Sequence, residues 1–132
     1  MDFNACMSKK PKSMSLPEVR GCINRLIYRP HKTQTDPELL TIVLLRKKEH
    51  HLGFLEGYTK LRSTGRWQEV KDNRIIRTYL DEKNVNLEIQ FRDRKDEAVG
   101  HHLIDLFTEL NERRIKEDLL YCRTMPIEET TL

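Results

Sequence analysis

The stretch that most constrains the fold is residues 84–111, where the apolar pattern changes from the strand period to the helix period. Its first part alternates apolar and polar residues, and the apolar ones are Val85, Leu87, Ile89 and Phe91. This alternation predicts a strand with one dry face. In the second part apolar residues recur at helical spacing, at Val99, Leu103, Leu106, Phe107 and Leu110. That spacing predicts an amphipathic helix, which needs a sheet to lie on.

The segments before this stretch predict several short strands. Residues 16–29 are expected to form the first strand, although their beginning could instead form a helical turn. The most hydrophobic run, residues 39–46, is β-branched in its middle and predicts a buried central strand. Residues 52–61 are expected to form a strand with Gly53 or Gly57 at a bulge or a close backbone approach.

Residues 66–83 fit two alternatives. In the first, residues 66–71 and 74–80 are two strands joined by a turn at Asp72 and Asn73, a good turn pair. In the second, residues 67–83 are one helix. The apolar residues of this segment do not make a clean helical stripe, so we favour two strands.

The order of these elements predicts an α+β fold. We expect a small, antiparallel, strongly bent sheet or partial barrel of about five to six strands, capped by a C-terminal amphipathic helix. In element order alone this resembles pleckstrin-homology-like barrels. The helix either continues through residues 113–122 or breaks near Asn111. A chain of 132 residues suits one domain, which we place at residues 16–123, between a flexible polar and basic tail (1–15) and a C-terminal tail (124–132).

Composition sets the class of protein and its compartment. The net charge is +3 with a pI near 8.8, which permits contact with nucleic acid without arguing for it. The three cysteines, Cys6, Cys22 and Cys122, are widely spaced, so we expect no disulfide framework and no zinc site, and a reducing compartment. We expect Cys22 and Cys122 to be buried thiols and Cys6 to lie free in the tail. No apolar run is long enough for a membrane span, and we predict an intracellular protein of the cytoplasm or nucleus.

The sequence contains no convincing catalytic or metal-binding constellation. His50-His51 and His101-His102 are adjacent pairs, and neighbouring residues on a strand or helix point in different directions, so neither pair makes a metal clamp alone. There is no GxSxG motif, no Gly-rich phosphate loop and no HExxH motif. We therefore expect no catalytic residues, no metal and no cofactor.

One segment resembles the box motif of the Nudix hydrolases. Glu69, Arg77, Asp81 and Glu82 fall at matching positions relative to one another, but Thr78 stands where that family has a glutamate. Ser63 and Asn84 stand in place of two of its glycines. The resemblance implies a Mg²⁺-dependent nucleotide hydrolase, degenerate in its motif, and it requires the helix over residues 67–83.

Basic residues interleaved with aromatic ones are the remaining signal. They are Arg46, Lys47, Lys48, Tyr58, Lys60, Arg62, Arg66 and Trp67. Because Trp and Arg are common at binding hot spots, we predict a non-catalytic module that binds a protein partner through a sheet edge or the groove beside the C-terminal helix. The alternatives are nucleic-acid binding through residues 46–48 and 60–67, and the Nudix-like hydrolase. A long exposed sheet edge would also make homodimerisation plausible.

Overall fold

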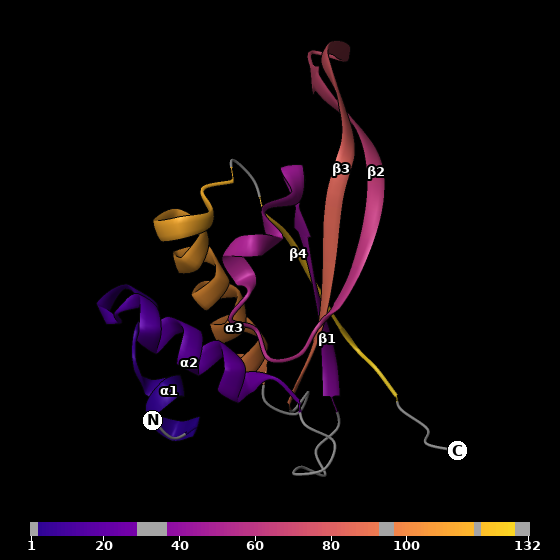
Figure 1. Ribbon diagram of the computed structural model, residues 1–132. Helices are drawn as coiled ribbons and strands as arrows, with labels where there is room; N and C mark the ends of the chain where they lie inside the picture. The colour runs from indigo at the N-terminus through magenta and orange to yellow at the C-terminus, as the bar shows by residue number, and fades with distance from the viewer. Residues whose placement is uncertain (1–2, 29–36, 93–96, 118–119, 129–132) are drawn as a thin grey trace.

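The computed structural model describes residues 3–28, 37–92, 97–117 and 120–128, and its centre is an antiparallel sheet with helices on one face (Figure 1). The strands are β1 (Pro37–Leu44), β2 (Thr59–Lys71), β3 (Arg74–Arg92) and β4 (Tyr121–Pro126), in the order β2-β3-β1-β4. A single bridge from Ile27 to Phe91 adds a fifth extended segment beside β3. The sheet is strongly curled, so the predicted α+β class with a bent antiparallel sheet and a helix after it is confirmed.

The helical elements cover one face of the sheet. They are α1 (Phe3–Ser8), η1 (Pro11–Ser13), α2 (Leu16–Leu26), η2 (Leu45–Leu52), α3 (Glu97–Leu110) and η3 (Asn111–Ile115). In Figure 1 α2 and α3 lie on the same side of the strands, and no described helix covers the other face. The arrangement differs from the pleckstrin-homology order because α2 precedes the sheet and β4 follows α3.

The core forms where the two predicted patterns meet. The four alternating residues of β3, Val85 to Phe91, are buried, as are the five predicted residues of α3 from Val99 to Leu110. The central strand β1 adds Leu40, Ile42 and Leu44, which share the face of the β3 residues because Ile42 pairs with Leu87. The expected packing of a strand and a helix against each other is therefore confirmed.

Residues 67–83 form the turn end of the β2–β3 hairpin and not a helix. Asp72 and Asn73 have positive φ values of 52° and 59°, as the two central residues of a type I′ turn require. The preferred two-strand alternative is therefore confirmed. The helix that the Nudix resemblance requires is absent. The backbone of this segment instead forms the hydrogen bonds that pair β2 with β3.

Residues 16–29 were predicted to be a strand, and this prediction was wrong. A capping box joins Ser15 and Glu18 at the start of α2. From there the buried residues follow helical spacing, at Val19, Cys22, Ile23 and Leu26. The prediction for residues 52–61 was also wrong at its beginning, since η2 ends at Leu52 and β2 begins only at Thr59. Gly53 and Gly57 precede the strand and form no bulge in it.

The two segments expected to be tails take part in the fold. Cys6, expected to be free in the N-terminal tail, is completely buried, and this burial strongly raises the pKa of its thiol. Arg113 donates hydrogen bonds to the carbonyl oxygens of Met14 and Lys12, which ties the N-terminal segment to the end of the helical layer.

At the other end of the chain, the helix does not continue through residues 113–122. Lys116 adopts a left-handed conformation with φ of 56° and donates its N–H to the Asn111 carbonyl, which ends η3. The chain then returns as β4 along β1, so strand pairing extends past the expected tail boundary at residue 124 to Pro126.

Candidate interaction surface

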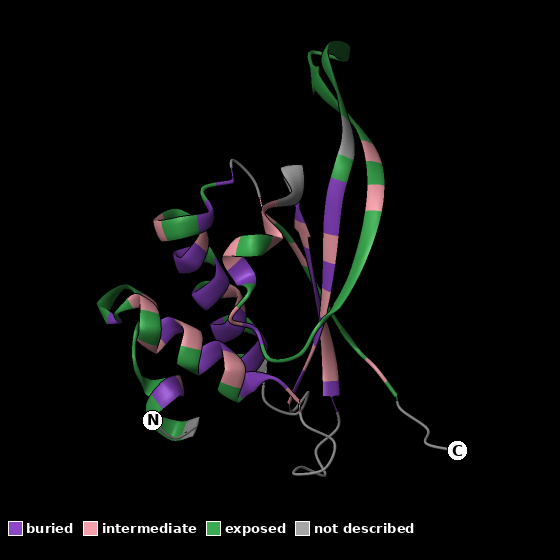
Figure 2. Ribbon diagram, viewed as in Figure 1, coloured by how far each residue is buried: buried purple, intermediate pink, exposed green. Residues whose placement is uncertain are grey.

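The distal part of the β2–β3 hairpin projects beyond the core, and we call residues 64–80 the arm (Figure 2). No arm residue belongs to the core cluster. Apart from Gly65, every arm residue is exposed. The exposed large apolar side chains of the arm are Trp67, Val70, Ile75, Ile76, Tyr79 and Leu80. The arm therefore presents apolar surface that the chain itself does not cover.

One face of the arm carries a small polar network. Trp67 pairs with Tyr79 across the strands, and Glu69 pairs with Arg77. Arg77 Nη1 donates to the Tyr79 hydroxyl at 2.9 Å, and that hydroxyl donates to Glu69 Oε2 at 3.4 Å. The hydrogen bond to Tyr79, with the charge of Glu69, raises the pKa of Arg77. These contacts order one face of a ribbon that has no core beneath it.

The other face of the arm is more aliphatic. Strand alternation places Arg66, Gln68 and Val70 on this face. Their cross-strand partners are Leu80, Thr78 and Ile75. The exposed fractions of Leu80 and Val70 are 68% and 59%, the two largest among the exposed large hydrophobic side chains of the described residues. This face therefore presents three exposed aliphatic side chains, Val70, Ile75 and Leu80, beside polar ones.

Two register shifts interrupt the pairing of β2 with β3, one at the base of the arm and one within it. One lies between Ser63 and Gly65 and the other between Glu69 and Val70, and in each the extra residue belongs to β3. Such bulges bend a strand and increase its twist. At the first one the Trp67 indole folds over Gly65, since a Cβ on Gly65 would lie 2.9 Å from Trp67 Nε1. Gly65 has no side chain, and the indole of Trp67 occupies the space that a side chain at this position would need.

A second surface lies at the opposite edge of the sheet. β4 pairs with β1 on one side, and its other side has no strand partner among the residues that the structure describes. Beside it runs a groove of about 350 Å³ between Gly100, His101 and Ile104 of α3 and Thr124–Pro126 of β4, with Glu38 at its end. We call this the α3–β4 groove. A free strand edge and a helix-lined groove therefore meet at one place.

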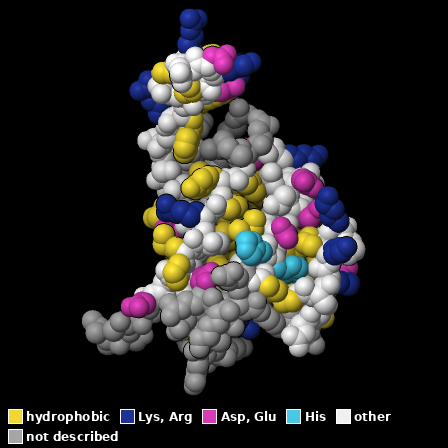
Figure 3. Space-filling view, turned by 180° about the vertical axis from the view of Figure 1, so that it is seen from behind, with side chains coloured by type: hydrophobic (Ala, Val, Ile, Leu, Met, Phe, Trp, Pro, Cys, Tyr) yellow, Lys and Arg dark blue, Asp and Glu magenta, His cyan; other side chains and the backbone are white. Residues whose placement is uncertain are grey.

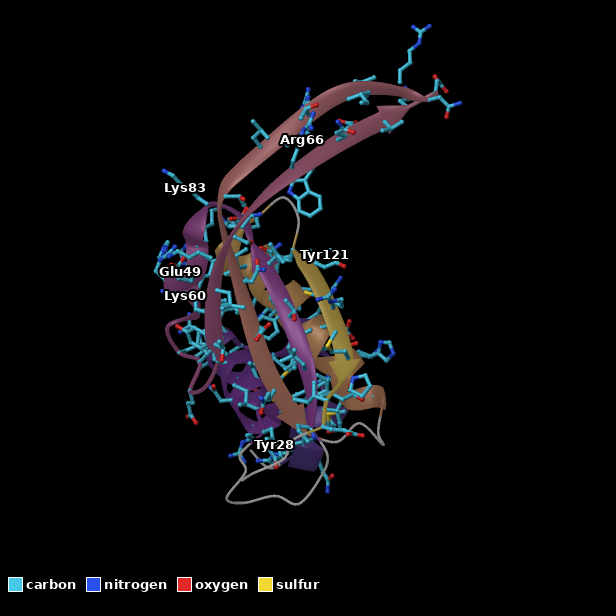
Figure 4. All side chains as sticks on the ribbon, turned by 90° about the vertical axis from the view of Figure 1, so that its right-hand side faces the viewer. Tyr28, Glu49, Lys60, Arg66, Lys83 and Tyr121 are labelled. Atoms are coloured by element: carbon cyan, nitrogen blue, oxygen red, sulfur yellow. The ribbon has the colours of Figure 1, made fainter. Side chains whose placement is uncertain are left out.

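The uncovered face of the sheet is partly apolar. Tyr121, Leu61 and Met125 are exposed on it by 50%, 48% and 38%. Figure 3, seen from behind and so toward the edge of the sheet that β4 forms, shows hydrophobic side chains gathered below the arm, with histidine and acidic side chains beside them. A second depression, of about 280 Å³, lies at the far end of the sheet, between Tyr28 and Tyr58. Figure 4 places Tyr28 at the end of the molecule opposite the arm.

The structure does not gather the predicted site residues into one patch. Arg66 and Trp67 lie on the arm. Lys60 and Arg62, near the start of β2, lie 3.9 Å and 3.5 Å from the same carboxylate oxygen of Glu49 (Figure 4).

Of the other predicted residues, Tyr58 lines the depression beside Tyr28. Lys48 donates to the carbonyl oxygens of Ile115 and Lys116, both at 3.3 Å, and lies 3.8 Å from Glu117. The side chains of Arg46 and Lys47 lie outside the part of the chain that the structure describes. Three of the basic residues thus serve local contacts within the fold.

Comparison with protein-family models, with curated proteins and with solved structures finds no match.

The histidines and carboxylates do not assemble into a metal centre within the described residues, where no group of three or more His, Cys, Asp or Glu could hold an ion. The ring centroids of His50 and His51 lie 4.0 Å apart. The pKa of His51 is lowered, mainly because its ring is partly removed from water. His102 is buried, with Nε2 3.9 Å from Cys6 Sγ. No described helix is long and apolar enough to cross a membrane.

Sequence reasoning missed the aliphatic residues of the arm. Val70, Ile75, Ile76 and Leu80 were read as parts of ordinary strands. A signal was present, because Ile75 and Ile76 are adjacent and break the alternation that a strand with one dry face requires.

Proposed function

We propose that the chain is a non-catalytic interaction module and that the arm is its main binding element for a protein partner. The observation that carries this proposal is the exposure of the large apolar side chains of the arm, up to 68% at Leu80. Burying apolar surface contributes roughly 25 cal/mol per Å², so a partner that covers the arm gains affinity from the side chains that the fold leaves in water.

The composition of the arm also fits a protein partner. Its aliphatic face supplies the dry centre of an interface, and the charged residues Arg66, Lys71 and Arg74 supply a polar rim. Trp67 and Arg66 are of the residue types that dominate binding hot spots.

Nucleic-acid binding is a second candidate, supported by the charge and shape of the arm. The arm carries four basic residues (Arg66, Lys71, Arg74, Arg77) and two acidic ones (Glu69, Asp72), which gives a net charge of +2. A two-stranded ribbon also fits the major groove of DNA. However, Arg77 is engaged by Tyr79 beside Glu69, and Lys60 and Arg62 are paired with Glu49. This leaves few basic side chains for phosphates and favours the protein partner.

The test is an affinity capture from the native cell extract, with and without nuclease, in which retained proteins are identified by mass spectrometry. Three baits are compared: wild type, the arm variant Ile76→Ser with Leu80→Ser, and the control Leu61→Ser, an exposed apolar residue of β2 outside the arm. Circular dichroism first establishes that all three fold.

A defined protein that survives nuclease, binds wild type and the control, and is lost from the arm variant supports the proposal. Equal retention by all three baits overturns the assignment to the arm. Loss of all binding with nuclease transfers the assignment to nucleic acid, for which affinity must then fall steeply with salt.

A further inference from the structure

We propose that the arm binds a second copy of this chain, in the α3–β4 groove. This inference rests on the proposed function, because it names the partner of the arm. It starts from the free edges of the sheet. Among the described residues, the order β2-β3-β1-β4 leaves one side of β2 and one side of β4 without a strand, and in the arm β3 has β2 as its one partner, because β1 pairs only with Val85–Arg92. Free strand edges bind other strands through their backbone N–H and C=O groups.

The arm and the groove cannot meet within one copy. β3 enters the arm at the end of the sheet where Leu44 pairs with Val85. The α3–β4 groove lies at the other end, where Glu38 pairs with both Phe91 and Pro126. Figure 1 shows the arm projecting away from that end. The eight residues of β1 separate the two sites by about 25 Å. Any contact between arm and groove must therefore join different copies.

The charges of the two surfaces are complementary. The arm has a net charge of +2, and Arg66, Lys71 and Arg74 are its basic side chains outside the network with Tyr79 and Glu69. Glu38 is the charged residue among those that line the groove. The exposed Asp105, one turn beyond His101, and Glu128, just after β4, follow lining residues in the chain. The basic residues beside them are Arg123 of β4 and Arg92, whose strand partner Pro37 adjoins Glu38. With His101 neutral, these three acidic and two basic side chains have a net charge of −1. Such complementarity steers association and selects the partner.

The apolar residues and the strand lengths also correspond. In the arm, β2 has a free edge along residues 66–71. These six residues match the six residues of β4, so the two edges could pair along the whole length of β4. The groove contributes Ile104 and Pro126 to receive aliphatic side chains such as Val70 and Leu80. Backbone pairing would supply affinity, and the apolar and charged side chains would fix the register.

A single arm–groove contact is small. The arm is about 27 Å long and about 10 Å wide, so one face covers only a few hundred Å², against about 800 Å² per partner in a standard interface. Because the two surfaces differ, each copy can both contribute an arm and receive one, in a closed dimer with two such contacts or in an open series of copies. The association is therefore expected to be weak, concentration-dependent and sensitive to salt.

Charge reversal tests this contact. Variant A carries Arg66→Glu and Lys71→Glu on the arm, and variant B carries Glu38→Lys and Asp105→Lys at the groove. In each variant alone, arm and groove have the same sign. In an equimolar mixture the arm of A faces the groove of B with opposite charge, and the arm of B faces the unchanged groove of A. The control is Glu112→Lys, which reverses an exposed carboxylate outside the groove lining.

Sedimentation equilibrium at low salt, from micromolar to submillimolar protein, gives the average mass. We expect the mass of wild type and of the control to rise with concentration, A and B alone to associate at least about tenfold more weakly, and their mixture to recover association. A wild type that stays monomeric overturns the inference, as does a mixture that fails to recover. If the wild type is monomeric and the arm variant still loses its captured protein, the proposed function stands and only the second copy is excluded.

Discussion

The same substitution at two positions of β3 should have very different costs. Leu80 lies in the arm and is 68% exposed, whereas Leu87 lies seven residues further along the strand and is completely buried. Fully burying a leucine contributes roughly 1.5–3 kcal/mol, and about a third of Leu80 is buried, so Leu80→Ala should cost less than about 1 kcal/mol. Leu87→Ala leaves a cavity in the core and should cost roughly 2–5 kcal/mol.

Urea unfolding followed by far-ultraviolet circular dichroism measures both costs. The only tryptophan, Trp67, lies on the arm, so its fluorescence reports on the arm and should not be the sole probe. The measurement should be made in dilute protein, where copies do not associate. A cost above about 2 kcal/mol for Leu80→Ala would mean that the arm is packed in the monomer, and the reasoning that places it outside the core would fail. A cost below about 1 kcal/mol for Leu87→Ala would refute the assigned register of β3.

Two further predictions concern the helical layer and β4. Ser15→Ala removes the capping box of α2 and should lower the free energy of unfolding by about 1 kcal/mol in urea titrations; an unchanged midpoint and slope would contradict the role of the cap. Burial raises the pKa of the Cys122 thiol to about 11, from an ordinary value of 9.0. A raised pKa stabilises the folded state below the unfolded pKa, so the contribution of this thiol to stability should be fully present below pH 9.0 and be lost as the pH rises to about 11. Cys122→Ala should lessen this fall without abolishing it, because burial also raises the pKa of the Cys6 thiol, which contributes a fall of its own. Parallel stability curves for the two proteins would rule out a contribution from Cys122.

The sequence predicted the structure best where the spacing of apolar residues fitted only one type of secondary structure. The alternation from Val85 to Phe91 and the helical spacing from Val99 to Leu110 both identified buried faces, because each side chain's position follows from its neighbours in sequence. The turn at Asp72 and Asn73 was identified by its residue types, which tolerate positive φ.

The errors arose where a short segment fitted two periods or where distant pairing decided the structure. In α2 the apolar residues allowed both strand and helix, and the capping pair Ser15 and Glu18, visible in the sequence, would have favoured the helix. The conformation of residues 121–126 depends on β1, some eighty residues away, so no local pattern could reveal it. The burial of Cys6 likewise depends on packing against elements far along the chain.

The sequence identified only some residues of the arm, because it shows the residue types but not which side chains are exposed. Residue type identified Arg66 and Trp67, but exposure decides which apolar residues are available to a partner, and exposure is a tertiary property. Ile76 and Leu80 resemble core residues in the sequence. They are surface residues in the structure because the hairpin extends beyond the helices that cover the rest of the sheet.

The turn at Asp72 and Asn73 closes the arm far from every core residue. Inserting or deleting one residue in each strand next to that turn preserves all the cross-strand pairs nearer the sheet and keeps each of their side chains on its own face. Each such step changes the length of the arm by about 3.3 Å and removes nothing from the core. The reach of the arm can therefore evolve in small increments, independently of the stability of the domain that carries it.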